Sequence, residues 1–306
     1  MSADSVSTDP MSTDSAPAPT RYLITGAAGM LGRDLQTALA SAPNPERRTV
    51  TALTRADLDI TDLAACADAV AGHHVVLNAA AYTAVDDAET NEEIATLINA
   101  TGAENLARAC ETVGGVLVQY STDYVFAGDA TGPYRESAAI APVSAYGRSK
   151  AEGERRAVAA HPHGTIILRT AWLYGEHGPN FVSTMLRLFR ERGTLTVVND
   201  QHGQPTWTRD LAEQTVRMLD AGVRSGTLHG TNAGATTWHG FARAIVENLG
   251  GDAASVTPTD SASFVRPAPR PANSVLAHDG WGRLGLTPMR DWRVALDDAM
   301  GQKVFT

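Results

Sequence analysis

Tyr146 and Lys150 place a phenol and an ammonium group four residues apart in the run AYGRSK at 145–150. In a helix this spacing brings both side chains to one face. A tyrosine titrates near pH ~10 in water, so it exchanges protons near neutrality only where a cation favours the phenolate. Lys150 can supply that cation, and the pair therefore indicates acid or base chemistry by Tyr146.

Thr122 offers a hydroxyl at the end of a strand-like run, QYSTDYVF at 119–126. Ligands of parallel sheets bind beyond the carboxyl ends of the strands. At that edge Thr122 could donate a hydrogen bond to a carbonyl that Tyr146 protonates. The alternative is a threonine that only forms the turn at the end of the strand.

The elements that must position these residues alternate along the chain. Short β-rich runs are predicted at 21–25, 49–54, 75–78, 115–120 and 165–169, with helix-like segments at 30–40, 63–71, 91–113 and 144–160. Strands that are apolar at nearly every position, each followed by a crossover helix, imply a parallel sheet covered on both faces. The predicted fold class is therefore α/β, a doubly wound parallel sheet of the Rossmann type.

A glycine-rich turn follows the first predicted strand. The run GAAGMLG contains Gly26, Gly29, Met30, Leu31 and Gly32. GxxGxxG between a strand and a helix is typical of dinucleotide binding, because glycines let the backbone approach a pyrophosphate at the helix N-terminus. Glycines that merely make a tight turn are the alternative, which the long βα alternation disfavours.

The end of the second predicted strand bears on the choice of dinucleotide. NAD enzymes usually offer an acidic residue there to the ribose 2′-hydroxyl, but the first acid in this chain is Asp57. Arg55 suits a 2′-phosphate and favours NADPH, whereas NADH stays open if Arg55 is a solvated loop residue. Asp59 and Ile60 are expected beside the adenine, and Lys150 could also hold the nicotinamide ribose.

Beyond Trp172 the alternation becomes irregular, which suggests a second lobe. We expect a disordered tail at 1–20, a dinucleotide-binding domain at 21–171 rejoined by 206–224, and a substrate-binding lobe made of 172–205 and 225–306. Such a plan suits an enzyme with one cofactor domain and one smaller domain that closes on the substrate.

Composition limits the partners. The 306 residues carry 25 Lys and Arg against 34 Asp and Glu, a formal charge of −9, which argues against nucleic acid as the main partner. No apolar run approaches the ~20 residues that span a bilayer, so no membrane segment is predicted. Cys66 and Cys110 are too few for a disulfide framework, which favours the cytoplasm. Histidines such as His161 lack ligand spacing and are expected in solvent, and no metal site is predicted.

Together, GxxGxxG, STDYVF and YxxxK resemble the extended short-chain dehydrogenase/reductases, and among them the dTDP-4-dehydrorhamnose reductase family. Four further segments agree with the resemblance, which extends from about residue 22 to 299: NAAAYTAVD at 78–86, RTAWLYG at 169–175, DQHGQPT at 200–206 and RPANS at 270–274. No single motif is specific, but the combination is.

The resemblance implies roles for individual residues. Thr122, Tyr146 and Lys150 match the catalytic triad, and Asn99 matches a helix asparagine that helps to hold the lysine. Cofactor contacts after the third strand match Ala79, Ala80 and Tyr82. The sugar pocket matches Thr83, Val85, Asp123, Tyr124 and Trp172, although the last two could be ordinary core aromatics. For the thymidine diphosphate, which the family holds in its C-terminal lobe, Asn180, Arg187 and Gln204 are candidates.

The implied reaction is the NAD(P)H-dependent reduction of the C4 ketone of a dTDP-4-dehydro-6-deoxy-L-hexose, with dTDP-4-dehydro-L-rhamnose giving dTDP-L-rhamnose as the first expectation. Reduction of another dTDP-deoxysugar, as in antibiotic biosynthesis, stays open. A nucleotide-sugar epimerase or dehydratase is a second alternative, and dehydratases usually carry Asp-Glu after the threonine where this chain has Asp123-Tyr124. A non-catalytic regulatory subunit is a third, which the intact triad disfavours. In some relatives, carboxylates join the subunits through magnesium, but no carboxylates of this chain match those positions, and a requirement for magnesium stays open. A homodimer also stays open.

Overall fold

The computed structural model describes residues 18–305. The tail predicted at 1–20 therefore lies outside the described residues over 1–17, and its last residue, Thr20, already begins the first strand.

Six parallel strands form the central sheet, in the order β10-β5-β4-β3-β1-β2. Each predicted strand is present with its ends shifted by at most two residues, which confirms the doubly wound fold. The bounds are Thr20–Thr25 for β1, Arg48–Leu53 for β2, Val75–Asn78 for β3, Val116–Thr122 for β4, Thr165–Thr170 for β5 and Gly226–His229 for β10.

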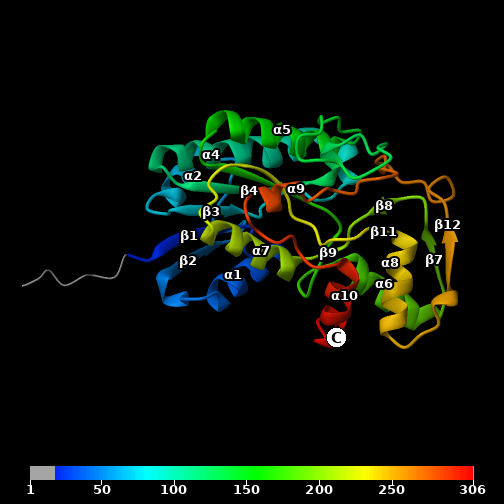
Figure 1. The fold of residues 1–306 in the computed structure, drawn as a ribbon. Coiled ribbons are helices and arrows are strands. Elements are labelled where there is room, and N and C mark those ends of the chain that lie inside the picture. Colours follow the sequence, from blue (N-terminus) through cyan, green and yellow to red (C-terminus); the bar gives the residue numbers. More distant parts are fainter. Residues whose placement is uncertain (1–17, 306) are drawn as a thin grey trace, which may run out of the picture.

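Helices cover both faces of this sheet (Figure 1). On one face lie α2 (Leu63–Val70), α4 (Gly102–Val113) and α5 (Ala145–Ala160), and on the other α1 (Met30–Ser41) and α7 (Thr208–Asp220). Because side chains alternate along a strand, Tyr22 and Ile24 enter the core under α1 and α7, whereas Leu23 enters the core under α2 and α4. Burial on both faces explains why these strands are apolar throughout.

The helix predicted at 91–113 is one helical stretch in three parts. α3 (Glu92–Thr96) runs into η3 (Leu97–Thr101), a π-helical turn, and then into α4. π-turns inside helices are rare and frequent at functional sites. This one contains Asn99.

The part of the chain after β5 builds a second core beside the sheet. Its residues include Tyr174, Phe241, Ile245 and Leu296. The elements are the helices α6 (Phe181–Arg192), α8 (Trp238–Asn248) and α10 (Trp292–Gly301), and the short strands β6 (Leu173–Tyr174), β7 (Leu195–Val198), β8 (His202–Gly203), β9 (Thr206–Trp207), β11 (Thr236–Thr237) and β12 (Val256–Thr259). The short helix α9 (Asp279–Arg283) follows β12 in the chain but packs against β10 of the central sheet.

Two parts of 225–306 lie elsewhere than in the smaller lobe expected for that range. β10 pairs with β5 at the edge of the central sheet, and Trp281 of α9 packs in the core under α1 and α7. α7, within 206–224, packs against α1. The chain thus crosses between the two regions more often than its sequence suggests.

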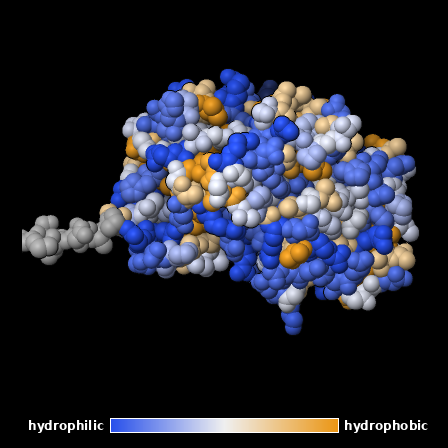
Figure 2. Space-filling model, viewed as in Figure 1, coloured by the Kyte–Doolittle hydropathy of each residue, from blue (hydrophilic) through white to orange (hydrophobic). Residues whose placement is uncertain are grey.

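The expectation that His161 lies in solvent is wrong. His161 is 5% exposed, and its ring contacts the Glu111 carboxylate and the Gly115 carbonyl. Cys66 and Cys110 are buried free thiols. Across the described residues, no helix has both the length and the apolar content needed to cross a membrane. The face shown in Figure 2 is mainly hydrophilic, with apolar side chains in small groups.

Candidate active site

The carboxyl edge of β4 meets the first turn of α5. Ser144 caps this helix by accepting a hydrogen bond from the Gly147 amide at 3.1 Å. Gly147 lies against the carbonyl of Tyr124, so a side chain at this position would push the helix away from the segment after β4. This close approach sets the rings of Tyr124 and Tyr146 edge to face, with centroids 5.8 Å apart.

Thr122 and Tyr146 lie together at this edge. The Thr122 hydroxyl donates to Asp123 Oδ1 at 2.9 Å and accepts from the Tyr124 amide at 3.2 Å, so Thr122 also forms the turn that sequence reasoning held as its alternative role. Burial, followed by the charge of Asp123, raises the pKa of Tyr146, and the Thr122 hydroxyl opposes that rise. Tyr146 is therefore protonated near neutral pH, as a proton donor must be.

Lys150 is buried one turn further along α5. Its ammonium donates to the main-chain carbonyl of Tyr120 at 2.6 Å. Burial lowers the pKa of Lys150 to about 8, although the charge of Glu154 opposes the shift. The ammonium thus lies against the strand, and the pKa of Tyr146 is raised and not lowered as we expected.

Asp123 is the most deeply buried carboxylate at the site, at 2% exposure. One of its oxygens faces Thr122, whereas Oδ2 has no hydrogen-bond partner among the described residues. Burial raises the pKa of Asp123 to about 6, against hydrogen bonding that includes the Thr122 hydroxyl. A buried, half-satisfied carboxylate costs stability and is typical of a functional site.

Asn99 does not contact Lys150 directly. Its amide bridges both backbone polar groups of Tyr82, at 2.8 and 3.0 Å, and donates to the Ser149 hydroxyl at 2.9 Å. Gly153 of α5 lies against the carbonyl of Asn99, where a Cβ would clash. The π-turn and this glycine therefore join α5 to the segment after β3.

The glycine-rich turn forms a cradle without side chains. Gly26 has φ +65°, and a Cβ there would lie 2.6 Å from the Ala80 amide nitrogen. Gly32 lies as closely against Gly26, and Gly29 ends the turn at the N-terminus of α1, where no side chain caps the helix and no acid occupies the first turn. Free amides at a helix N-terminus attract an anion, so the cradle fits the pyrophosphate of a dinucleotide. Met30 packs against Gly175, and Leu31 is in the core.

The residues expected around the adenosine lie beyond β2. Arg55 is exposed in a turn in which Thr54 bonds to the Asp57 carboxylate at 2.6 Å. Asp59 accepts from the Thr61 amide and hydroxyl at 2.9 and 2.7 Å. The Ile60 side chain packs against Gly102 in the core, so a ligand could reach only its backbone.

The segment after β3 faces both the cradle and α5. Ala79 and Ala80 are half-buried against Gly26, and Tyr82 packs with Tyr146 near Ala145. Further along, Thr83 is exposed and Val85 half-buried.

An ion-paired segment closes the other side of Tyr124. Asp86 accepts hydrogen bonds from Arg266 at 2.5 and 3.0 Å and from Arg270 at 2.9 Å. The Arg270 guanidinium carbon lies 5.8 Å from the centroid of the Tyr124 ring. Tyr124 is therefore held between Tyr146 and a cation from the last third of the chain, beyond what its motif indicated.

Trp172 has an unusual backbone conformation, with φ 46°. Its indole stacks on Trp238 at 3.6 Å between ring centroids, and Gly203 lies against its other side. Left-handed φ is rare for large side chains and marks sites where neighbours over-determine the geometry. Trp172 thus belongs to the second core as well as to the expected sugar pocket.

The three candidates for the nucleotide have polar groups with protein partners. Asn180 caps α6 and donates to the Gly175 carbonyl at 2.9 Å, Arg187 pairs with Glu191 at 3.0 Å, and buried Gln204 bonds to the backbone of Leu276 at 2.8 and 3.2 Å. Asn180 and Gln204 thus hold parts of the fold in place, whereas Arg187 is exposed, and the nucleotide-binding roles of all three stay predictions.

Sequence reasoning missed several buried polar groups below the site. Glu154 and Arg169 form a buried ion pair at 2.7 Å, and Ser121 donates to Glu154 at 2.5 Å. Glu154 comes four residues after Lys150, so its helical spacing could have indicated it. Gln119 lies in a run that was recognised, but nothing in its spacing distinguishes it from a strand residue.

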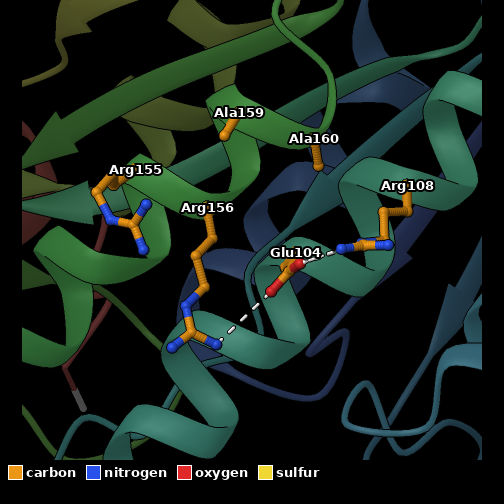
Figure 3. A pocket seen from close by; sticks show the side chains of 6 residues that line it. All are labelled: Glu104, Arg108, Arg155, Arg156, Ala159 and Ala160. Atoms are coloured by element: carbon orange, nitrogen blue, oxygen red, sulfur yellow. Dashed lines mark hydrogen bonds and ion pairs between the residues drawn. The ribbon is translucent and has the colours of Figure 1, made fainter.

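A surface pocket of about 330 Å³ lies away from this edge, between α4 and α5. Figure 3 shows Arg108 and Arg156 both directed at Glu104, with Arg155 beside them. The arginines are largely neutralised by carboxylates, and the pocket has no contact with the catalytic residues. Among residues 18–305, no group of three or more His, Cys, Asp or Glu is arranged to hold a metal ion.

Known proteins resemble this chain along nearly its whole length. The family described as RmlD substrate binding domain matches residues 20–304. A dTDP-4-dehydrorhamnose reductase of Streptomyces griseus is 48% identical over 91% of this chain and 92% of its own length. A protein of Streptomyces antibioticus, described as a probable dTDP-4,6-dihydroxy-2-methyloxan-3-one 4-ketoreductase, is 50% identical over 91% and 94%.

Solved structures agree with these relatives. The structure of dTDP-4-dehydrorhamnose reductase from Bacillus anthracis in complex with NADP superposes with a TM-score of 0.88 at 37% identity, covering 93% of this chain and all of that one. The motifs and the match at 20–304 thus agree, and the chain belongs to the dTDP-4-dehydrorhamnose reductase family.

Proposed function

We propose that this protein reduces the C4 ketone of a dTDP-4-dehydro-6-deoxy-L-hexose with NADPH, and that dTDP-4-dehydro-L-rhamnose is its substrate and dTDP-L-rhamnose its product. The observation that carries the proposal is the meeting of Thr122, Tyr146 and Lys150 at the sheet edge served by the glycine cradle. Relatives of the same family that are named as such reductases support the choice of substrate.

The chain's own residues would act on the ketone as follows. The Thr122 hydroxyl exchanges its hydrogen bond to Asp123 for one to the C4 oxygen, and it holds that oxygen beside the phenol of Tyr146. As negative charge develops on that oxygen, Tyr146 transfers its proton to it. Lys150 then stabilises the phenolate that remains, because an ammonium ion nearby favours the charged form.

The cofactor site fits NADPH. The cradle of Gly26, Gly29 and Gly32 would hold the pyrophosphate, and Arg55 would hold the 2′-phosphate. When bound, NADPH supplies the hydride that reduces C4. NADH stays the alternative, because Arg55 is exposed in a loop, as a solvated residue with no role in binding would be.

A second substrate has the support of one close relative. The 50% identical relative of Streptomyces antibioticus is described as a ketoreductase for a different dTDP-linked sugar. Both substrates require the same acid and the same hydride donor, so the distinction depends on the pocket around Tyr124 and Trp172. An assay should therefore offer both keto-sugars. A cytoplasmic location and a homodimer belong to the same proposal.

The test is NADPH oxidation with freshly generated dTDP-4-dehydro-L-rhamnose. Loss of a general acid costs about 10²–10⁴ in rate, so Tyr146→Phe should lose at least about a hundredfold in kcat while NADPH binding persists. Tyr22→Phe also removes one phenol hydroxyl, but it does so in β1, near the end of that strand that is farther from the glycine turn. This variant should keep the wild-type rate. Equal rates for Tyr146→Phe and wild type would refute the assignment of the acid. Repeating the assay in EDTA decides whether magnesium takes part.

A further inference from the structure

A row of buried polar side chains crosses the central sheet below the site. Thr25 ends β1, Asn78 ends β3, and Gln119 lies beside Asn78 within β4; none of the three is more than 2% exposed. Thr25 donates to Asn78 Oδ1 at 2.6 Å, and Asn78 Nδ2 donates to Gln119 Oε1 at 2.6 Å. Polar groups at such depth are costly unless every bond is made, so the row has a defined geometry.

The backbone fixes the direction of this row. The Ala80 amide donates to Asn78 Oδ1 at 3.2 Å, which requires an oxygen at that position. The nitrogen of Asn78 must therefore face Gln119, and the nitrogen of Gln119 must face away from Asn78. Gln119 Nε2 accordingly donates to the Tyr120 carbonyl at 3.1 Å.

Lys150 donates a hydrogen bond to this same carbonyl oxygen of Tyr120. The oxygen accepts Lys150 Nζ at 2.6 Å, so its two lone pairs receive one amide and one ammonium donor. β3 ends at Asn78, opposite Gln119, and β4 continues for three more residues. On the side of β3, the Tyr120 carbonyl therefore receives its hydrogen bonds from side chains and not from the backbone of a neighbouring strand.

We propose that Gln119 is a positioning residue for Lys150, which holds the ammonium at the sheet edge by fixing the Tyr120 carbonyl on which it rests. The importance of this role rests on the proposed function, in which Lys150 stabilises the phenolate of Tyr146. The glutamine is suited to it because it donates to the carbonyl while accepting from Asn78, and because it adds no charge beside the ammonium.

Ionisable groups on the segments around Lys150 include Tyr146 and Glu154 of α5, Arg169 of β5, Asp123 after β4 and Tyr82 after β3, and of these Glu154 is the one whose charge acts on Lys150. Glu154 is held by Arg169 and already acts on Lys150. A new carboxylate at position 119 would approach the ammonium from the other side, along the Tyr120 carbonyl. Its effect is therefore separable from that of Glu154.

The composition of the chain makes Lys150 directly observable. Of its 25 basic residues other than histidine, only Lys150 and Lys303 are lysines, and Lys303 is exposed. Lysine labelled with ¹³C at Cε should give one buried and one exposed signal by NMR, and Lys303 serves as the internal reference. The first experiment titrates these signals in wild type, Gln119→Glu and Thr215→Val, without substrate or turnover.

Thr215→Val is the matched control. It removes a buried hydrogen bond to the Tyr120 hydroxyl, 3.0 Å long, on the opposite face of the same strand. We expect Gln119→Glu to raise the titration midpoint of Lys150 by about one pH unit, because a nearby negative charge favours the ammonium. Thr215→Val should leave the midpoint unchanged. An unchanged midpoint in Gln119→Glu would overturn the proposal.

Kinetics provide the second experiment. Gln119→Met keeps the size of the side chain and removes its donor, so kcat should fall about tenfold, equivalent to 1.36 kcal/mol, while the KM for NADPH changes less than about twofold. A folded Gln119→Met variant with the kcat of Thr215→Val would overturn the role. If wild type reduces no dTDP-keto-sugar, the proposed function fails, and the NMR titration still decides whether Gln119 positions Lys150.

Discussion

A single residue, Lys150, should make the activity depend on pH. Burial lowers its pKa to about 8, so the ammonium that stabilises the phenolate is present below that pH and lost above it. We expect kcat to fall as pH rises through about 8. In Lys150→Arg any residual activity should lack this fall, because a guanidinium stays charged to about pH 12. The measurement is kcat against pH between 6 and 10. A variant that retains the same fall would assign it to another group.

The buried charge of Asp123 lowers the stability of the fold. Burial raises its pKa to about 6, so the folded state disfavours the charged form, and stability decreases as pH rises from about 4 to 6. Asp123→Asn removes this cost and should increase the free energy of unfolding at pH 7 by on the order of 2–3 kcal/mol. The activity should fall, because the partner of the Thr122 hydroxyl loses its charge.

Thermal unfolding of both proteins at pH 7.5 and pH 4 tests the Asp123 prediction. The gain should be present at pH 7.5 and nearly absent at pH 4, where wild-type Asp123 is already protonated. An asparagine variant no more stable than wild type at pH 7.5 would show that burial of the charge is compensated.

At the scale of elements, one glycine controls the distance between α5 and η3. A Cβ at Gly153 would clash with the carbonyl of Asn99, so Gly153→Ala should push α5, with Lys150, away from the segment that Asn99 holds. Overpacking of this kind costs about 1–3 kcal/mol, and kcat should fall as well. Gly301→Ala is the control, since nothing lies near that helical glycine. Urea unfolding that gives equal stabilities for the two variants would contradict this role of Gly153.

The elements were predictable where periodicity alone defines them. The first five strands and their helices follow from buried apolar runs and helical spacing, and the glycine turn from its position between β1 and α1. β10 was missed because GTLH is short and half polar, and the π-turn was missed because Leu97–Thr101 reads as ordinary helix. Gln119 and Asn78 could not be recognised, because their role depends on strand register, which the sequence does not display.

At the scale of the whole molecule, nearly every cation is an arginine. The chain has 25 basic residues besides histidine and only two lysines, one of them at the active site. Arginine remains charged at all physiological pH values and forms bidentate pairs, as in Arg290 with Asp210, whereas lysine titrates when buried. The distribution therefore places the titratable amine where proton chemistry occurs and permanent charges where segments are joined.

Asp86 joins the two parts of the molecule across the site. It receives Arg266 and Arg270 from the last third of the chain and follows directly on Val85 of the expected sugar pocket. Although burial opposes it, hydrogen bonding from Arg266 lowers the pKa of Asp86, so its pairing is present above about pH 4 and is lost as pH falls below the lowered value. Because Arg270 also lies over Tyr124, the pair determines how firmly the segment 264–270 closes on the pocket.

We expect Asp86→Asn to release this segment without changing the chemistry. Hydrogen exchange of amides at 264–270 should accelerate, and the KM for the dTDP-sugar should rise about tenfold, the equivalent of 1.4 kcal/mol, with the affinity for NADPH unchanged. Asp87→Asn alters the exposed neighbouring carboxylate and should change neither quantity. If exchange accelerates but the KM stays constant, the ion pairs hold the fold and not the substrate. If the affinity for NADPH falls as well, Asp86 supports the whole sheet edge, because the segment that carries it also lines the glycine cradle at Ala79 and Ala80.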